Sequence, residues 1–106
     1  MTDDVGAIFA ALADPTRRRV VETLLAEGRT SVPALTAELP ITRQAVAKHL
    51  ATLRDAGLVE RSPGRGREVL WELRPGALAP AAGWMQATQR AWEGRLDRLK
   101  RAVERG

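Results

Sequence analysis

The 106-residue sequence has no cysteine. Disulfide bonds, thiolate-bound metals and thiol redox switches are therefore excluded. Histidine is nearly absent as well, because His49 is the only one, and the chain has neither a glycine-rich phosphate loop nor a cluster of carboxylates. A catalytic nucleophile would thus have no base beside it. We predict that the protein is not an enzyme and has no cofactor.

Long apolar runs are missing too. No stretch approaches the length of a membrane span, and the N-terminus lacks the basic and apolar regions of a signal peptide. We therefore expect a cytoplasmic protein without membrane contact. No internal repeat or low-complexity linker divides the chain, so residues 1–106 are expected to form one domain.

The composition favours a polyanionic partner and a dimer. Lysine and arginine number 17 against 13 aspartates and glutamates, which gives a net charge of +4. Such a balance favours a polyanion over acidic partners, but a modest net charge is also ordinary for a soluble protein, so the distribution of charge matters more. The hydrophobic content of 44% is sufficient for a core, but so small a domain often gains stability by oligomerisation.

The strongest pattern is an amphipathic helix that follows Thr42. The Thr42 hydroxyl can cap the helix by accepting a backbone N–H of the first turn, and Gly57 can end it in the left-handed conformation. The apolar side chains recur at the spacing of one helical face: Val46, Leu50 and Leu53. The opposite face is polar: Gln44, Lys48 and Asp55. One face is therefore expected to pack while the other stays free.

A shorter helix is predicted just before it, over residues 32–39. Ser31 can cap this helix, and Pro33 falls in the first turn, where the missing N–H costs little. Pro40 ends it, which leaves a turn of about three or four residues before Thr42, as a helix-turn-helix requires. The alternative is an ordinary pair of helices in a small helical domain.

A β-hairpin is predicted after the second helix and favours the helix-turn-helix interpretation. The ranges 59–62 and 67–73 suit strands, and residues 63–66 read Pro-Gly-Arg-Gly, a turn. Arg65 and Arg67 would stand at the tip of this wing, where arginine can contact phosphates or the minor groove. The alternative for both is a solvated charged turn.

The remaining segments are predicted to be helical. Asp3 can cap a first helix, and Asp14 with Pro15 starts a second one, in which the expected core residues are Val20, Val21, Leu24 and Leu25. Three consecutive arginines, Arg17 to Arg19, are interpreted as solvated or paired with carboxylates rather than as a DNA site. The fold class is therefore mainly helical: four helices, a two-stranded hairpin and a fifth helix.

The fifth helix, over residues 81–104, carries an apolar face that needs a partner. We expect it to pack against a second copy of the chain, together with the first helix. The predicted dimer contacts are Val5, Ile8, Trp84, Thr88, Trp92, Leu96 and Leu99. The alternative is that Trp84 and Trp92 line a pocket for a small-molecule effector.

Several segments in this order resemble the ArsR family of bacterial winged-helix repressors. They are residues 13–21 (ADPTRRRVV), 45–50 (AVAKHL), 56–59 (AGLV) and 64–73. The resemblance covers nearly the whole chain. It implies a winged helix-turn-helix homodimer, joined by its terminal helices, that represses by binding a palindromic operator in double-stranded DNA.

The chain departs from the metal-sensing members of that family. Where those members carry a Cys-Val-Cys type motif, this sequence has Ser31, Val32 and Pro33. Other members use histidine and carboxylates of the terminal helices, but Glu93 and Asp97 have no histidine near them in the sequence. We therefore predict no metal site and a branch that does not sense metals.

The predicted DNA contacts are Thr42, Arg43, Gln44, Lys48, His49, Arg65 and Arg67. Arg43 and Gln44 are the expected base readers, because arginine forms bidentate pairs with guanine and glutamine with adenine. His49 is open between a DNA contact and a packing role. The competing function is a winged-helix protein-interaction module that does not bind DNA specifically.

Overall fold

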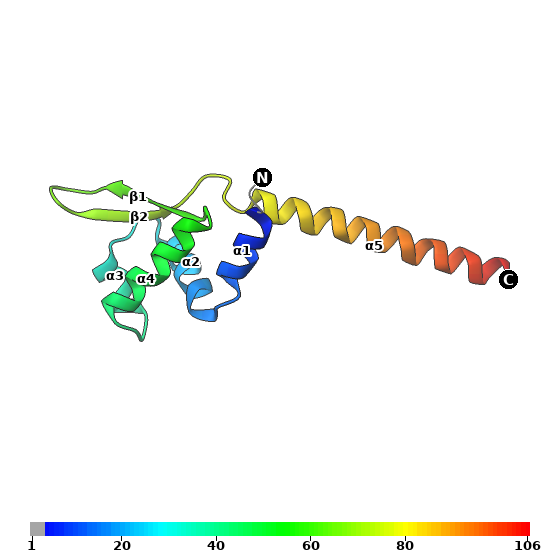
Figure 1. The fold of residues 1–106 in the computed structure, drawn as a ribbon, viewed down its shortest axis with the longest axis horizontal. Coiled ribbons are helices and arrows are strands. Elements are labelled where there is room, and N and C mark those ends of the chain that lie inside the picture. Colours follow the sequence, from blue (N-terminus) through cyan, green and yellow to red (C-terminus); the bar gives the residue numbers. More distant parts are fainter. Residues whose placement is uncertain (1–3) are drawn as a thin grey trace.

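The computed structural model describes residues 4–106. The helices are α1 (Asp4–Leu12), α2 (Pro15–Glu27), α3 (Val32–Glu38), α4 (Arg43–Asp55) and α5 (Ala79–Arg105), and the strands are β1 (Val59–Pro63) and β2 (Val69–Leu73). The order α1-α2-α3-α4-β1-β2-α5 confirms the expected fold class (Figure 1). The predicted cap at Asp3 lies outside the described residues.

The molecule is elongated because α5 leaves the body. Helices α1 to α4 and the hairpin form that body, and α5 projects from it as a single rod (Figure 1). The overall extents are 71 × 30 × 22 Å. No helix within residues 4–106 is both long enough and apolar enough to cross a membrane.

Side chains cap the helices as the sequence predicts. Asp14 accepts the backbone N–H groups of Thr16 and Arg17, at 2.7 and 3.1 Å. The hydroxyls of Ser31 and Thr42 accept the N–H three residues onward, at 3.3 and 3.1 Å. These bonds satisfy donors that a helix start leaves unpaired, so they fix where α2, α3 and α4 begin.

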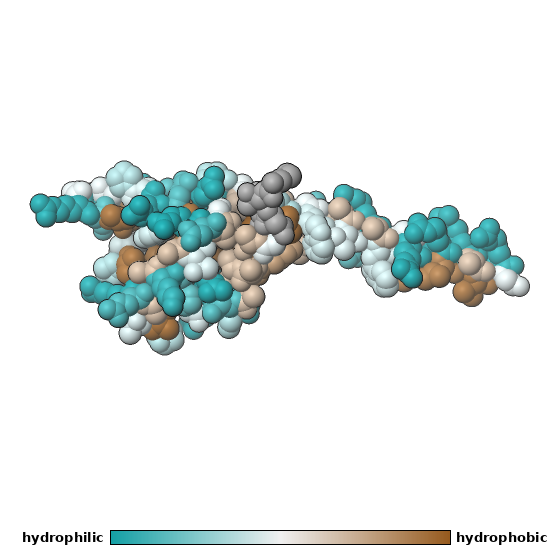
Figure 2. Space-filling view, in the orientation of Figure 1, coloured by the Kyte–Doolittle hydropathy of each residue, from teal (hydrophilic) through white to brown (hydrophobic). Residues whose placement is uncertain are grey.

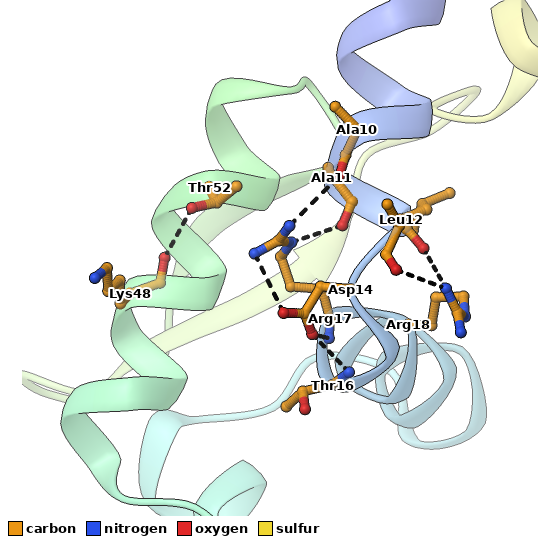
Figure 3. A network of polar contacts seen from close by, with 10 residues as sticks. Ala10, Ala11, Leu12, Asp14, Thr16, Arg17, Arg18, Lys48 and Thr52 are labelled. Atoms are coloured by element: carbon orange, nitrogen blue, oxygen red, sulfur yellow. Dashed lines mark hydrogen bonds and ion pairs between the residues drawn. The ribbon is translucent and has the colours of Figure 1, made fainter.

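Two arginines of α2 close the end of α1 (Figure 3). Arg17 Nε donates to the carbonyl of Ala11 at 2.6 Å, and Arg18 Nη1 donates to the carbonyl of Leu12 at 2.7 Å. Arg17 also lies 3.8 Å from the Asp14 carboxylate. The expected carboxylate pairing is therefore present for Arg17, but most of the bonds go to backbone carbonyls at the negative end of α1.

The core lies between the helices and the inner face of the hairpin. Its buried members are Ile8, Ala11, Val20, Val21, Leu24, Leu35, Leu39, Val46, Leu50, Leu53, Leu58, Val59, Trp71 and Ala81. Leu25 was expected here, but that prediction is wrong, because its side chain is 63% exposed. Leu25 follows Leu24 by about 100° around the helix, which turns it away from the body.

A reciprocal backbone pair fixes the hairpin to the body. β1 and β2 are antiparallel, with Val59 opposite Leu73 and Pro63 opposite Val69. Thr30, just before α3, pairs with Trp71 of β2 through two N–H···O bonds of 2.9 Å each. The wing is therefore tied to the start of the helix-turn-helix.

Candidate nucleic-acid interface

The second helix of the motif, α4, buries one face and exposes the other. Val46, Leu50 and Leu53 are fully buried against the body. The exposed side chains at the start of the helix and along its outer face are Thr42, Arg43, Gln44, Ala47 and Lys48. Apolar packing therefore sets the rotation of α4 and leaves a row of polar groups facing outward.

The Thr42 hydroxyl is left mainly to donate to DNA, because its oxygen is used as the helix cap. Its hydroxyl oxygen already accepts the N–H of Ala45. The hydroxyl hydrogen remains available as a donor, which suits a phosphate oxygen. Arg43 and Gln44 follow directly in the first turn of α4, where a helix lying in the major groove contacts base edges.

Ala47 is an exposed residue on this face that the sequence reasoning missed. It lies one turn after Gln44 and beside Lys48. A methyl group on an otherwise polar face offers contact to the thymine C5 methyl. Sequence alone gave no signal for it, because alanine is common on any helix.

The tip of the wing is an ordered turn that presents two arginines. The N–H of Gly64 donates to the carbonyl of Glu68 at 2.9 Å, and the N–H of Arg65 donates to the Glu68 carboxylate at 3.4 Å. Gly66 has a φ of +59°, a conformation that favours glycine. Arg65 and Arg67 are exposed, and neither forms an ion pair with any residue of the described chain.

The hairpin is shorter than expected at one end. β2 begins at Val69 rather than at residue 67, because the turn closed by Glu68 holds residues 64–68. Both predicted arginines therefore belong to the tip, which extends beyond α3 and α4 (Figure 1). The structure thus places basic groups at the far end of the wing and along α4.

His49 faces the body rather than the outer row. It is half-buried, and its Nδ1 atom is buried without a hydrogen-bond partner among the described residues. Whether His49 contacts DNA stays a prediction.

The environment of Asp14 connects α2 with α4. The backbone N–H of Arg17 is the main influence that holds the pKa of Asp14 below its ordinary value of 3.8, while partial burial works against it. The N–H of Thr16 and the charges of Arg17 and His49 lower this pKa further. Asp14 is therefore an ionised cap that also lies within electrostatic reach of α4.

The predicted dimer residues divide into two groups. Those on α5 are exposed: Trp84, Thr88, Trp92, Leu96 and Leu99. Met85 and Val103, which the sequence prediction omitted, are exposed on the same helix, and apolar colour gathers along one edge of its outer half (Figure 2). On α1, Val5 is half-buried.

Ile8, the other α1 residue predicted to contact the dimer partner, is buried inside its own protomer. It is only 2% exposed and is part of the core of the protomer. The helical pattern of α1 placed Ile8 with Val5, but the body of the same chain already covers it. Phe9 is the exposed aromatic of α1, and its ring meets that of Trp84 edge-on at 5.6 Å, which joins α1 to the base of α5.

The next feature is the placement of side chains that could bind a metal ion. Residues 4–106 contain no group of three or more histidine, aspartate or glutamate side chains placed to share an ion. His49 lies in α4, away from Glu93 and Asp97 of α5, so the carboxylates and the imidazole are not brought together.

A helix-turn-helix with a capped, outward-facing second helix and a basic β-hairpin defines a winged helix-turn-helix domain. Residues 12–62 match the family described as a helix-turn-helix domain. The uncharacterized HTH-type transcriptional regulator YuzN of Bacillus subtilis is 39% identical to the chain, over 71% of this chain and 89% of its own. The ArsR-like transcriptional regulator from Rhodococcus sp. RHA1 has a solved structure that is 35% identical, with a TM-score of 0.80 over 92% of this chain and 91% of that one.

The chain belongs to the ArsR family of HTH-type transcriptional regulators and, as such, binds DNA. These relatives are transcription regulators and not enzymes, as the sequence predicts. A further similar structure is that of the cadmium metal-sensor CMTR from Mycobacterium tuberculosis, 41% identical with a TM-score of 0.60, over 74% of this chain and 79% of that one. Relatives of this chain therefore include a protein named for metal sensing.

Proposed function

We propose that this ArsR-family regulator is a cytoplasmic homodimeric repressor that binds a palindromic operator and responds to a signal other than a metal ion. The observation that carries the proposal is an exposed polar row on α4 beside a wing tip with two arginines, neither of which forms an ion pair with any of residues 4–106. The helix row can enter the major groove while the wing holds the flanking backbone.

The base contacts are assigned to the first turn of α4. Arg43 and Gln44 are exposed there and have no ion pair or hydrogen-bonded side-chain partner within residues 4–106 that would compete with DNA. Lys48 lies one turn further, within reach of a base or a phosphate. The Thr42 hydroxyl donates its hydrogen to a DNA phosphate at the start of α4, and Arg65 and Arg67 contact phosphates beside it.

The dimer is assigned to α5. Trp92, Leu96 and Leu99 are each about half exposed although all three are large and apolar. The outer half of α5 meets no part of its own body (Figure 1). A second copy related by a two-fold axis would cover this face and would place two α4 helices on successive major grooves.

A signal other than a metal is supported by the chemistry of the chain. Cysteine is absent from the sequence, and residues 4–106 contain no group of three or more histidine, aspartate or glutamate side chains placed to share an ion. The relative named as a cadmium sensor shows that the fold is compatible with metal sensing, so the difference lies in the side chains. A titration with Zn²⁺ and Cd²⁺ tests this, because DNA release at micromolar metal would contradict it.

The test of the whole proposal is the anisotropy of a labelled duplex from the DNA upstream of this protein's own coding region. The protein is titrated at two salt concentrations, with a scrambled duplex of equal length as the control. We expect tighter binding to the upstream duplex and a steep loss of affinity with salt. Dimerisation without salt-dependent affinity for any duplex would favour the protein-interaction module instead.

A further inference from the structure

A cavity lies where α1, the end of α4 and the connection from β2 to α5 meet. Its volume is about 380 Å³, which is within the range of small-ligand sites. The apolar part of its wall includes Ala7, Ile8, Ala77 and Pro80. The cavity therefore adjoins the helix that is proposed to read DNA and the helix that is proposed to form the dimer.

Two arginines, Arg54 and Arg74, form the basic part of this wall. Arg54 Nε lies 3.9 Å from the Asp55 carboxylate, and Arg74 Nε lies 3.6 Å from the Glu60 carboxylate. Both distances exceed those of good N–H···O bonds. Both side chains are about half exposed, at 46% and 54%. Each guanidinium therefore keeps donors for another acceptor.

The end of α4 does not use up these donors. The N–H groups of Ala56, Gly57 and Leu58 already bond the last carbonyls of the helix, at 3.1, 2.9 and 2.9 Å. Arg74 Nη1 stands over this helix end, 3.4 Å from the place of a Cβ on Gly57. Asp55 is the single carboxylate in the wall, and Glu60, the ion-pair partner of Arg74, lies outside it.

From this arrangement we propose that the cavity binds a small organic acid. The carboxylate lies between Arg54 and Arg74, where planar guanidinium groups form charge-assisted pairs. The apolar body of the ligand packs against α1 and residues 77–80. Neither arginine is among the proposed DNA or dimer contacts, so the binding does not depend on the proposed operator.

The test is to titrate the ¹⁵N-labelled full chain with phenylacetate and, separately, with hexanoate. The chemical shifts of the backbone amides report the binding. We expect saturable shifts at Gly57, Gly76 and Ala77, with a dissociation constant of about 1 mM or lower. Phenylacetamide has the same shape without the charge, so it should bind at least about tenfold more weakly. Equal binding of the amide, or no saturable shift with either acid, would overturn the proposal.

Variants distinguish the effect of these two arginines on binding from the effect of general surface charge. Arg54→Gln and Arg74→Gln should each weaken binding of phenylacetate, and the double variant should weaken it more than tenfold. Arg29→Gln, an exposed arginine outside the cavity, is the matched control and should bind as the parent does. The amide spectrum of each variant shows that it is folded. Unchanged affinity in the folded double variant would show that the arginines do not hold the acid.

Discussion

At the scale of single residues, the proposal depends most on Gln44. Its side chain is exposed in the first turn of α4. A bidentate contact with adenine contributes about 1–3 kcal/mol of discrimination. We therefore expect Gln44→Ala to change the preferred base at one operator position while affinity for unrelated DNA stays nearly the same.

Competition among duplexes that differ by single base pairs measures the base preference of the Gln44→Ala variant and of the parent. Gln86→Ala, which removes an exposed glutamine from α5, is the matched control. If the Gln44 variant ranks the duplexes as the parent does, Gln44 is not a base reader.

Asp14 gives a prediction for acid stability. Its pKa lies below the ordinary value of 3.8, mainly because the N–H of Arg17 bonds the ionised carboxylate. A carboxylate with a lowered pKa in the folded state stabilises the fold above its unfolded pKa, and this contribution is lost as the pH falls through the folded value. Asn can still cap a helix but carries no charge.

The thermal stability of the parent and of Asp14→Asn should therefore differ more at about pH 6 than at about pH 3. Asp55→Asn, which changes an exposed carboxylate at the C-terminal end of α4, is the control. A difference that is the same at both pH values would mean that the charge of Asp14 does not contribute.

At the scale of elements, the wing is expected to contribute affinity without sequence preference. Arg65 stands at the tip of a turn held by Glu68. Arg65→Gln should weaken binding to every duplex by a similar factor and reduce the slope of log K against log salt by about one. Salt titrations of the parent and of Arg90→Gln, an exposed arginine of α5, provide the comparison. An unchanged slope would show that Arg65 of the wing does not contact the phosphates.

The elements that the sequence predicted well are those fixed by neighbouring residues. Asp14, Ser31 and Thr42 bond to groups two or three positions away, so their roles follow from local spacing. The start of β2 was missed because Glu68 closes the tip through bonds to Gly64 and Arg65, which a strand pattern does not reveal.

Tertiary features of the site were harder to predict. The bonds from Arg17 and Arg18 go to carbonyls, and every residue has a carbonyl, so no side-chain pattern marks them. The exposure of Ala47 depends on how α4 is rotated by its buried face. The cavity between Arg54 and Arg74 is formed by three segments far apart in the sequence.

At the scale of the whole molecule, the outer half of α5 should determine the oligomeric state. We expect the double variant Leu96→Glu and Leu99→Glu to raise the dissociation constant of the dimer more than about 100-fold, because two apolar contacts are replaced by charges of one sign. The body should remain folded, since this part of α5 meets none of the other described elements of its protomer (Figure 1).

Sedimentation velocity measures the mass, and circular dichroism the helical content. Arg90→Glu with Arg98→Glu changes two exposed positions of the same helix away from its apolar face and is expected to remain dimeric. If the Leu96 and Leu99 variant stays dimeric, the dimer interface does not lie on the outer half of α5.

The backbone pair between Thr30 and Trp71 constrains how this molecule can adapt to its target. The strand that leads from the wing tip is bonded to the residue just before the helix-turn-helix, so the hairpin cannot swing about its base without breaking both bonds. The distance between α4, which is proposed to read the major groove, and the wing tip, which is proposed to contact the DNA backbone, is then fixed before DNA is bound. Such a protein loses little entropy in ordering its wing, and a duplex of the wrong groove width must deform to fit it. If α4 and the wing tip contact DNA as proposed, we expect the stiffness of the DNA outside the contacted bases to contribute to recognition.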